Sequence, residues 1–545
     1  MNGCLKVFCV LLLAVSVFKT AGAAELHVSP AGNDENPGTA AAPLASLDGA
    51  RRAIRERRWN GHEPVTVWIH GGTYHLTEPF RLESKDSGSE DAPIVYRAVP
   101  GEEVVLKGSL PVDPRAWRPW ERGIYRQSLA GTPLEGRRIN QLFMNNKRMV
   151  RARFPNWDYQ NPLRTGRGYV HAVNKPSMEW LQYDPADFNG REANWKHPET
   201  GIVHAFHVNN WGNFQFRIRD IDHQRHTIHF AEGGWQAQRR YGVGVKRAGT
   251  PGSPFYVENI FEELDAPFEW FFDTEQQMLY FKPPANVDLS EAVVEAAFVA
   301  RLIEVVGASH VHFEGLHLTQ TRTTFMDPYT DLARGDWAIH RGGAIYFHDA
   351  RHCSVRNCHV EQVGGNGIFV DGRNREVHIV GCLVEDTGDS AVCFVGDPKA
   401  VREYQTWEKP VPEIRDRTPG PKSDDYPANC SVRNCILRDV GVYGKQTSGV
   451  IISMAMDITV DHCSVYRIAR AGITINDGTW GGHVISNCDI YDAVLDTGEH
   501  GPFNSWGRER FWRGRQLDKS LVLLDAIKPV RLYHNRVGNY RPAVS

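Results

Sequence analysis

The second half of the chain repeats a short pattern of alternating apolar and polar residues. Five segments carry a cysteine just after a polar corner: Ser354–Val360, His378–Val384, Ser431–Leu437, Thr459–Val465 and Val484–Ile490. A weaker copy occupies His312–Leu318. A period of two is typical of strands, and a helical period is absent. Cys358 and Cys382 lie 24 residues apart, and Cys463 and Cys488 lie 25 residues apart. A repeat of this length predicts a stacked solenoid of short strands.

Such coils stack about 4.8 Å apart, so equivalent residues should form columns. The inward column is predicted to be Cys358, Cys382, Cys435, Cys463 and Cys488, and Asn357, Asn434 and Asn487 should lie beside it at the turn. The eight cysteines between positions 353 and 488 invite a disulfide interpretation in an exported protein. Their regular spacing favours packed free thiols, with one or two bridges as the alternative. No CxxC pair occurs, so we expect no metal at the cysteines.

The pattern divides the chain into four parts. Residues 1–23 are interpreted as a signal peptide, and residues 24–110 as an N-terminal cap with the first coils, including a helix over 46–56. Residues 111–285 break the repeat with longer alternating strands, which predicts an inserted β-sandwich-like module. Residues 286–545 form the main solenoid. The predicted fold class is therefore an all-β, right-handed parallel β-helix with an inserted β-sandwich-like module.

Composition and the N-terminus indicate an exported protein without a membrane span. The apolar run at 7–18 is too short to cross a bilayer, and Ala21–Ala23 supplies small residues for cleavage. No later run reaches the ~20 apolar residues that a membrane helix needs. The formal net charge of -3 offers no basic field for nucleic acid or an anionic membrane. We expect a monomer in the periplasm or outside the cell.

The candidate chemistry lies where the repeat breaks its own pattern, near the C-terminus. The strand after Gly501 should be apolar, because Gly501 is interpreted as occupying the small-residue position of Gly472, yet it is polar. The predicted carboxylates are Asp496 and Glu499, and the predicted sugar-binding residues are His500, Asn504, Trp506, Arg508 and Arg510. Acids can transfer protons, while amides, guanidinium groups and an indole suit a sugar. The alternative is a polar surface rung with salt bridges.

A second segment, Asn476–Trp480, adds Asp477 as a carboxylate and Trp480 as a sugar platform. Its plain alternative is an Asp-Gly turn. If both strands are straight, Asp477 and Glu499 lie some 20 Å apart at ~3.3 Å per residue. A turn that folds back would be needed to bring them together. Asp389 shares a column with Glu499 three repeats away, roughly 14 Å, which is too far for a pair of glycosidase carboxyls.

Several motifs together resemble the parallel β-helix glycoside hydrolases of family 141, which are related to family 120. The motifs are His27–Asp34, Gly71–Tyr74, Ala92–Ala98, Phe143–Asn156 and Glu499–Trp512. The resemblance implies α-L-fucosidase or xylanase-type activity on plant cell-wall glycans, with a pair of catalytic carboxylates. Glu499 matches an acidic position of the last motif. In such proteins we expect the second carboxylate on an Asp-rich strand beyond the rung of Asn535. The sequence given ends at Ser545, so either that acid lies further on or Asp477 or Asp496 takes its place.

The leading hypothesis is an exported glycoside hydrolase in which Glu499 and a second carboxylate cleave a polysaccharide or oligosaccharide. One rival is a polysaccharide lyase on the same scaffold, with Arg508, Arg510 and His500 neutralising a uronate and removing a proton. A second rival is a non-catalytic glycan-binding β-helix protein, and a third is a folded remnant of an enzyme with an uncovered last coil. No cofactor is expected, and a structural calcium ion is an open alternative.

Overall fold

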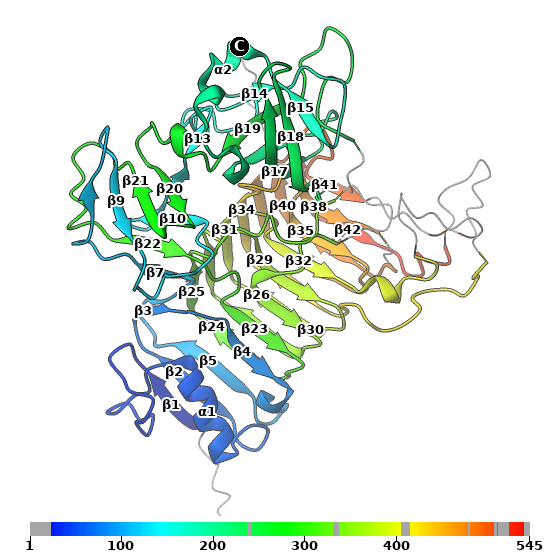
Figure 1. Cartoon of the computed structure of the whole chain (residues 1–545). Coiled ribbons are helices and arrows are strands. Elements are labelled where there is room, and N and C mark those ends of the chain that lie inside the picture. Colours follow the sequence, from blue (N-terminus) through cyan, green and yellow to red (C-terminus); the bar gives the residue numbers. More distant parts are fainter. Residues whose placement is uncertain are drawn as a thin grey trace, which may run out of the picture.

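The computed structural model describes residues 23–236, 241–330, 337–404, 415–477, 480–505, 510, 521 and 523–538. Three long parallel sheets stack strand upon strand along one axis (Figure 1). Each coil contributes one strand to sheet 1, the next to sheet 2 and the next to sheet 3. The all-β parallel β-helix predicted from the cysteine repeat is therefore confirmed.

The strands of the three sheets are short. Sheet 1 contains β1 (Ala24–Val28), β2 (Val65–Ile69), β5 (Ile94–Ala98), β24 (Val311–Glu314), β27 (Arg351–Arg356), β30 (Arg375–Val380), β33 (Ser431–Arg433), β36 (Thr459–Asp461), β39 (Val484–Ser486) and β42 (Arg531–Tyr533). Sheet 2 contains β3 (Gly72–His75), β6 (Val104–Lys107), β25 (Leu316–Thr319), β28 (His359–Glu361), β31 (Leu383–Thr387), β34 (Ile436–Val440), β37 (Ser464–Ile468), β40 (Asp489–Tyr491) and β43 (Arg536–Gly538). Sheet 3 contains β4 (Phe80–Glu83), β23 (Ile303–Val306), β26 (Gly343–His348), β29 (Asn366–Asp371), β32 (Val392–Val395), β35 (Ser448–Ser453), β38 (Ala471–Ile475) and β41 (Phe503–Ser505).

The cysteine column lies inside the coil at the corner between sheets 1 and 2. The five thiols are buried and free, and each Sγ donates to the backbone carbonyl two residues before it, at 3.1–3.5 Å. The residue before each cysteine has a left-handed backbone, with φ between 52° and 68°: Asn357, Gly381, Asn434, His462 and Asn487. Glycine and asparagine adopt this conformation most readily, which explains the Asn and Gly before the cysteines in the sequence.

The first coil is covered by helix α1 (Leu47–Arg57), close to the predicted 46–56. The helix begins there because the Ser46 hydroxyl accepts the backbone N–H of Gly49 at 2.9 Å, which caps an otherwise unpaired donor. Leu47, Ala50 and Ile54 are buried in the same hydrophobic core as the coils. The helix thereby shields the apolar end of the solenoid from water.

The residues between β6 and β23 form a separate module of sheets that are antiparallel except where β12 pairs with β20 (Figure 1). Its strands are β7 (Ser109–Pro111), β8 (Arg118–Pro119), β9 (Tyr125–Ser128), β10 (Gln141–Met144), β11 (Lys147–Arg148), β12 (Val150–Arg151), β13 (Arg153–Phe154), β14 (Val170–His171), β15 (Trp180–Gln182), β16 (Ile202–Phe206), β17 (Asn213–Asp222), β18 (Thr227–Gly233), β19 (Pro254–Glu258), β20 (Glu269–Asp273), β21 (Met278–Phe281) and β22 (Val294–Ala297). The short helix α2 (Pro185–Phe188) and three 3-10 turns, η2 (Arg191–Asn194), η3 (Pro198–Thr200) and η4 (Phe261–Glu263), complete it. The remaining 3-10 turns of the described residues, η1 (Ser84–Asp86) and η5 (Pro398–Ala400), lie in loops of the solenoid.

The place of the insertion decides where a cleft can form. The chain leaves the solenoid after β6 in sheet 2 and returns at β23 in sheet 3, so the module replaces one corner between these two sheets. Figure 1 shows the module, cyan to green, beside the stack. In the part of the chain that is described, no helix has the length and apolar character of a membrane span.

Candidate active site

The inserted module is fastened to the corner between sheets 2 and 3 on later coils. Arg148 of β11 forms an ion pair with Asp386 of β31 at 2.6 Å. The Tyr443 hydroxyl donates to Gln141 Oε1 at 2.9 Å, and Asn213 Nδ2 donates to the Tyr443 carbonyl at 2.8 Å. These contacts hold the module over the turns that connect β31 to β32 and β34 to β35.

A cleft of about 420 Å³ lies between the module and this corner. That volume is within the range of small-molecule sites. Its aromatic lining comprises Trp157, Tyr159, Tyr256, Trp270 and Tyr443, and its acidic lining comprises Glu258, Asp386, Asp439 and Asp496. Aromatic surfaces together with a few convergent polar groups are typical of a site that binds a largely apolar ring bearing hydroxyls.

Two of the carboxylates occupy one column on neighbouring coils. Thr387 pairs with Val440, so Asp386 stands opposite Asp439, about 4.8 Å away by strand spacing. Both have left-handed backbones, with φ of 48° and 54°. Their side chains are 34% and 37% exposed. The stacking of coils therefore presents two adjacent acids to the cleft.

The surroundings of these two acids differ. Burial among the cleft walls raises the pKa of Asp386; the Arg148 guanidinium opposes the rise and the charge of Asp439 adds to it. Asp439 instead forms a two-pronged ion pair with the Arg467 guanidinium. The raised pKa suits Asp386 to the role of a general acid, while Arg467 holds the Asp439 side chain in place beside it.

Two further acids are committed to ion pairs. Glu258 of β19 lies 3.4 Å from Arg151 and 3.3 Å from His204 Nε2. Burial acts to raise the pKa of Glu258, but His204 and Arg151 outweigh it, so the pKa is lowered. Asp496 is 1% exposed, lies 3.0 Å from Lys445 Nζ and accepts the backbone N–H of Arg164 at 2.6 Å. The sequence-predicted Asp496 thus lines the cleft as a buried, paired carboxylate.

The structure brings Glu499, His500 and Asn504 together, as the motif predicted, but none of them lines the cleft. Glu499 is 38% exposed and lies 3.2 Å from His500 Nε2. The His500 Nδ1 and Asn504 Nδ2 atoms are 3.0 Å apart, and the His500 ring packs on Trp337 at 5.1 Å. Glu499 is the accessible carboxylate of this group.

Asp477 lies away from Glu499, because the two residues are at opposite ends of the strands of sheet 3. Ile475 pairs with Ser505, so Asp477 follows the carboxyl end of its strand while Glu499 precedes the amino end of the next. Asp477 is 1% exposed. The same register corrects one expectation from the sequence: Ile473 pairs with Phe503, which places Pro502, and not Gly501, opposite Gly472.

Two predicted sugar-binding residues are buried instead. Trp480 is 1% exposed and packs on the Tyr426 ring at 4.6 Å, so it presents no face to a sugar. Arg510 has no exposed side chain and binds Asp525 at 2.9 Å, the Asp416 carbonyl at 2.9 Å and the Thr418 carbonyl at 2.7 Å.

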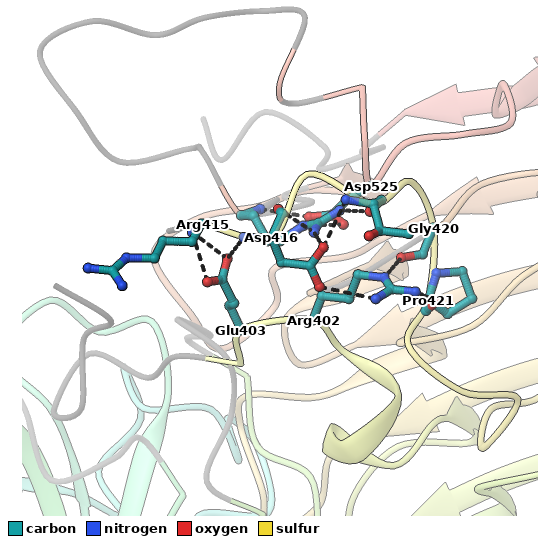
Figure 2. Close-up of polar contacts among 9 residues, drawn as sticks. Arg402, Glu403, Arg415, Asp416, Gly420, Pro421 and Asp525 are labelled. Carbon is teal, nitrogen blue, oxygen red and sulfur yellow. Dashed lines mark hydrogen bonds and ion pairs between the residues drawn. The ribbon is translucent and has the colours of Figure 1, made fainter. Parts of the chain in front are cut away.

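Figure 2 shows the loop that carries Asp416 and Gly420 beside Asp525, and Arg402 forms an ion pair with Asp416 at 3.1 Å. Glu403 accepts the backbone N–H groups of Arg415 and Asp416 in the same loop. This network fastens the loop between β32 and β33 to the C-terminal segment. Trp506 and Arg508 lie outside the described residues.

Sequence reasoning missed Asp386, Asp439 and Glu258. A signal for the first two exists, because the column that begins with Gln362 and continues through Asp386 and Asp439 is polar at a constant offset from the cysteines. Glu258 belongs to the inserted module. The repeat does not extend into this module, so the sequence does not indicate that it lies over the corner. The cleft itself arises only when the module folds onto the stack.

Known proteins resemble this chain over a larger share of its structure than of its sequence. No family model matches the chain. Over 93 residues, 17% of the chain, it is 35% identical to pectate lyase PEL9 of Emericella nidulans, of which it matches 20%. Over 83 residues it is 40% identical to the uncharacterized protein YwoF of Bacillus subtilis, covering 15% of each chain. The chain thus matches a fifth or less of these curated relatives.

A solved structure described as a glycoside hydrolase superposes with a TM-score of 0.71 at 18% identity. The match covers 95% of this chain and 96% of that one. At this identity the likeness shows a shared fold across both chains.

Proposed function

We propose that this protein is an exported, carbohydrate-active enzyme that hydrolyses glycosidic bonds in the cleft between the inserted module and the corner of sheets 2 and 3. The observation that carries the proposal is the stacked pair Asp386 and Asp439 on the wall of an aromatic cleft. Asp386, with its raised pKa, donates a proton to the glycosidic oxygen. Asp439, positioned by Arg467, attacks or stabilises the sugar carbon.

The spacing of the two acids leads to a stereochemical expectation. Neighbouring coils lie about 4.8 Å apart. Retaining glycosidases place their carboxyl groups about 5–5.5 Å apart, whereas inverting enzymes leave room for a water at about 6.5–9.5 Å. We therefore expect retention of the anomeric configuration. Glu499, with His500 and Asn504, is the alternative acid that the sequence motif favours, with Asp477 or Asp496 as its partner.

The proposed substrate is a plant-type polysaccharide or oligosaccharide. The resemblance to family 141 makes α-L-fucosidase and xylanase activities the first to assay. A second candidate function, polysaccharide lyase, is favoured by the cations around the cleft and by the sequence likeness to a pectate lyase over 93 residues. The cleft-lining cations are Arg148, Arg151, Arg153, Lys445 and Arg467. They could neutralise a uronate carboxylate.

The experiment is an assay of the purified protein on xylan, fucosylated xyloglucan and pectic polysaccharides. Hydrolysis releases reducing ends without ultraviolet absorbance, whereas elimination leaves an unsaturated, absorbing product. Asp386→Asn and Asp439→Asn should each lower kcat by about 10²-fold or more, the usual worth of an acid–base group. Asp492→Asn is the matched control, because Asp492 lies in the same column but does not line the cleft. Loss of activity in Glu499→Gln, with Asp386→Asn unaffected, would move the site to the C-terminal motif.

A further inference from the structure

A cluster of histidines and glutamates lies on the outer face of sheet 2, separate from the cleft lining. His317 of β25 pairs with His359 of β28, so the two imidazoles stack on adjacent coils. Their ring centroids are 4.6 Å apart and the ring planes differ by 11°. Both side chains are partly exposed, at 20% and 32%. The coil spacing, and not a flexible loop, fixes the relative position of the two rings.

Two carboxylates converge on these rings. Glu361, two residues after His359 on the same strand face, lies 2.9 Å from His317 Nε2 and 3.8 Å from His359 Nε2. Glu385, on the next coil, lies 3.0 Å from His359 Nε2. One ligand atom from each of His317, His359 and Glu361 falls within 4.8 Å of the others.

These separations match a metal centre. Zn²⁺ binds imidazole nitrogen and carboxylate oxygen at about 2.0–2.2 Å in a tetrahedron, which places ligand atoms about 3.3–3.6 Å from one another. The observed 2.9 Å and 3.8 Å separations bracket that value. Two imidazoles select a transition metal over Ca²⁺ or Mg²⁺, which prefer all-oxygen sites.

We propose that His317, His359 and Glu361 bind a divalent transition-metal ion of the Zn²⁺ type, with water completing the tetrahedron. The neighbours support this role. Glu103 Oε1 lies 3.6 Å from His317 Nδ1, where a carboxylate can orient a metal-binding imidazole through its other nitrogen. Arg438 forms an ion pair with Glu385 and fixes its position.

The ion would join two consecutive coils through β25 and β28. Glu385 directly precedes Asp386, which lines the cleft. Because β28 pairs with β31, the metal would stiffen the coil next to the strand that carries the proposed acid, without contacting the sugar. This inference stands independently of the glycosidase proposal, because it rests on a different set of side chains.

The test is titration of tag-free, EDTA-treated mature protein with ZnCl₂ by isothermal calorimetry, with CaCl₂ as the comparison. We expect one Zn²⁺ per chain, a rise in Tm on binding, and the visible spectrum of a tetrahedral site when Co²⁺ replaces Zn²⁺. His359→Gln should weaken Zn²⁺ binding by about 100-fold or more, and Glu103→Gln by about 10-fold. His352→Gln is the matched control, since His310 and His352 stack in the same way at 4.7 Å beside a single bonded carboxylate, Glu376.

Circular dichroism checks that each variant is folded, and Glu361→Gln serves if His359→Gln is not. Absence of Zn²⁺ binding by the wild-type protein would overturn the proposal. So would an affinity that His359→Gln and Glu361→Gln leave unchanged, or one that His352→Gln lowers as strongly. In those cases the cluster is a hydrogen-bonded ladder of imidazoles and carboxylates only.

Discussion

Breaking the ion pair between Lys445 and Asp496 should destabilise the corner under the inserted module. Lys445 is 9% exposed and Asp496 1% exposed, and their charged atoms are 3.0 Å apart. Asp496→Ala leaves the ammonium buried without its counter-ion, which costs about 3–5 kcal/mol. It also removes the acceptor of the Arg164 N–H, at 2.6 Å. Removing both charges in Lys445→Met/Asp496→Asn should cost much less, because no unpaired ion remains and the amide can still accept that N–H.

Urea denaturation followed by tryptophan fluorescence measures this difference. A double-mutant cycle on Lys445→Met, Asp496→Asn and the combined variant gives the coupling energy, which we expect at about 2 kcal/mol or more. Additive single effects would refute the reasoning. A cost below about 1 kcal/mol for Asp496→Ala would do so as well, because that is the range of a solvent-exposed ion pair.

Three further outcomes follow from the coil geometry and its burial. Asn434→Ala should lower the free energy of unfolding by about 1–2 kcal/mol, because alanine is strained at the left-handed φ of 53°, while Asn434→Gly should not; thermal unfolding compares them. Burial raises the pKa of Asp389 to about 6, so the folded protein holds this proton more tightly than the unfolded chain and stability falls as pH rises from about 4 to 6. Asp389→Asn should remove this pH dependence of the free energy of unfolding, which amounts to about 3 kcal/mol by the size of the pKa shift. Urea denaturation of both proteins across this pH range measures the difference. All eight cysteines of the described residues are buried, so native protein should not react with a thiol reagent at pH 8, whereas unfolded mature protein should show eight free thiols without reductant. Fewer than eight would indicate bridges.

The stack could be predicted from the sequence because each coil repeats one local conformational requirement. A left-handed residue precedes a small buried thiol, as at Asn434 and Cys435, and this pair recurs in five coils, at intervals of 24, 53, 28 and 25 residues. Helix α1 has its own signal in the sequence, the capping residue Ser46. Local rules of this kind need no knowledge of distant contacts.

The candidate site needed contacts that no repeat encodes. Arg148 meets Asp386 across 238 positions, and that contact exists only because the module folds back onto the corner from which it leaves. The strand register expected from the sequence was also wrong by one residue near the C-terminus. The sequence pattern aligned Gly501 with Gly472, whereas the hydrogen-bonded register pairs Ile473 with Phe503. In strands, one residue of register reverses which face a side chain occupies.

The central claim is that the glycan binds between the inserted module and the corner acids. A crystal structure of Asp439→Asn, soaked with an oligosaccharide that the wild-type protein cleaves, tests it directly. We expect a sugar ring against the cleft aromatics Trp157 and Tyr443, with its glycosidic oxygen within hydrogen-bonding distance of Asp386. A sugar bound over Glu499, or at the opposite edge of sheet 3 beside Asp477, would contradict it.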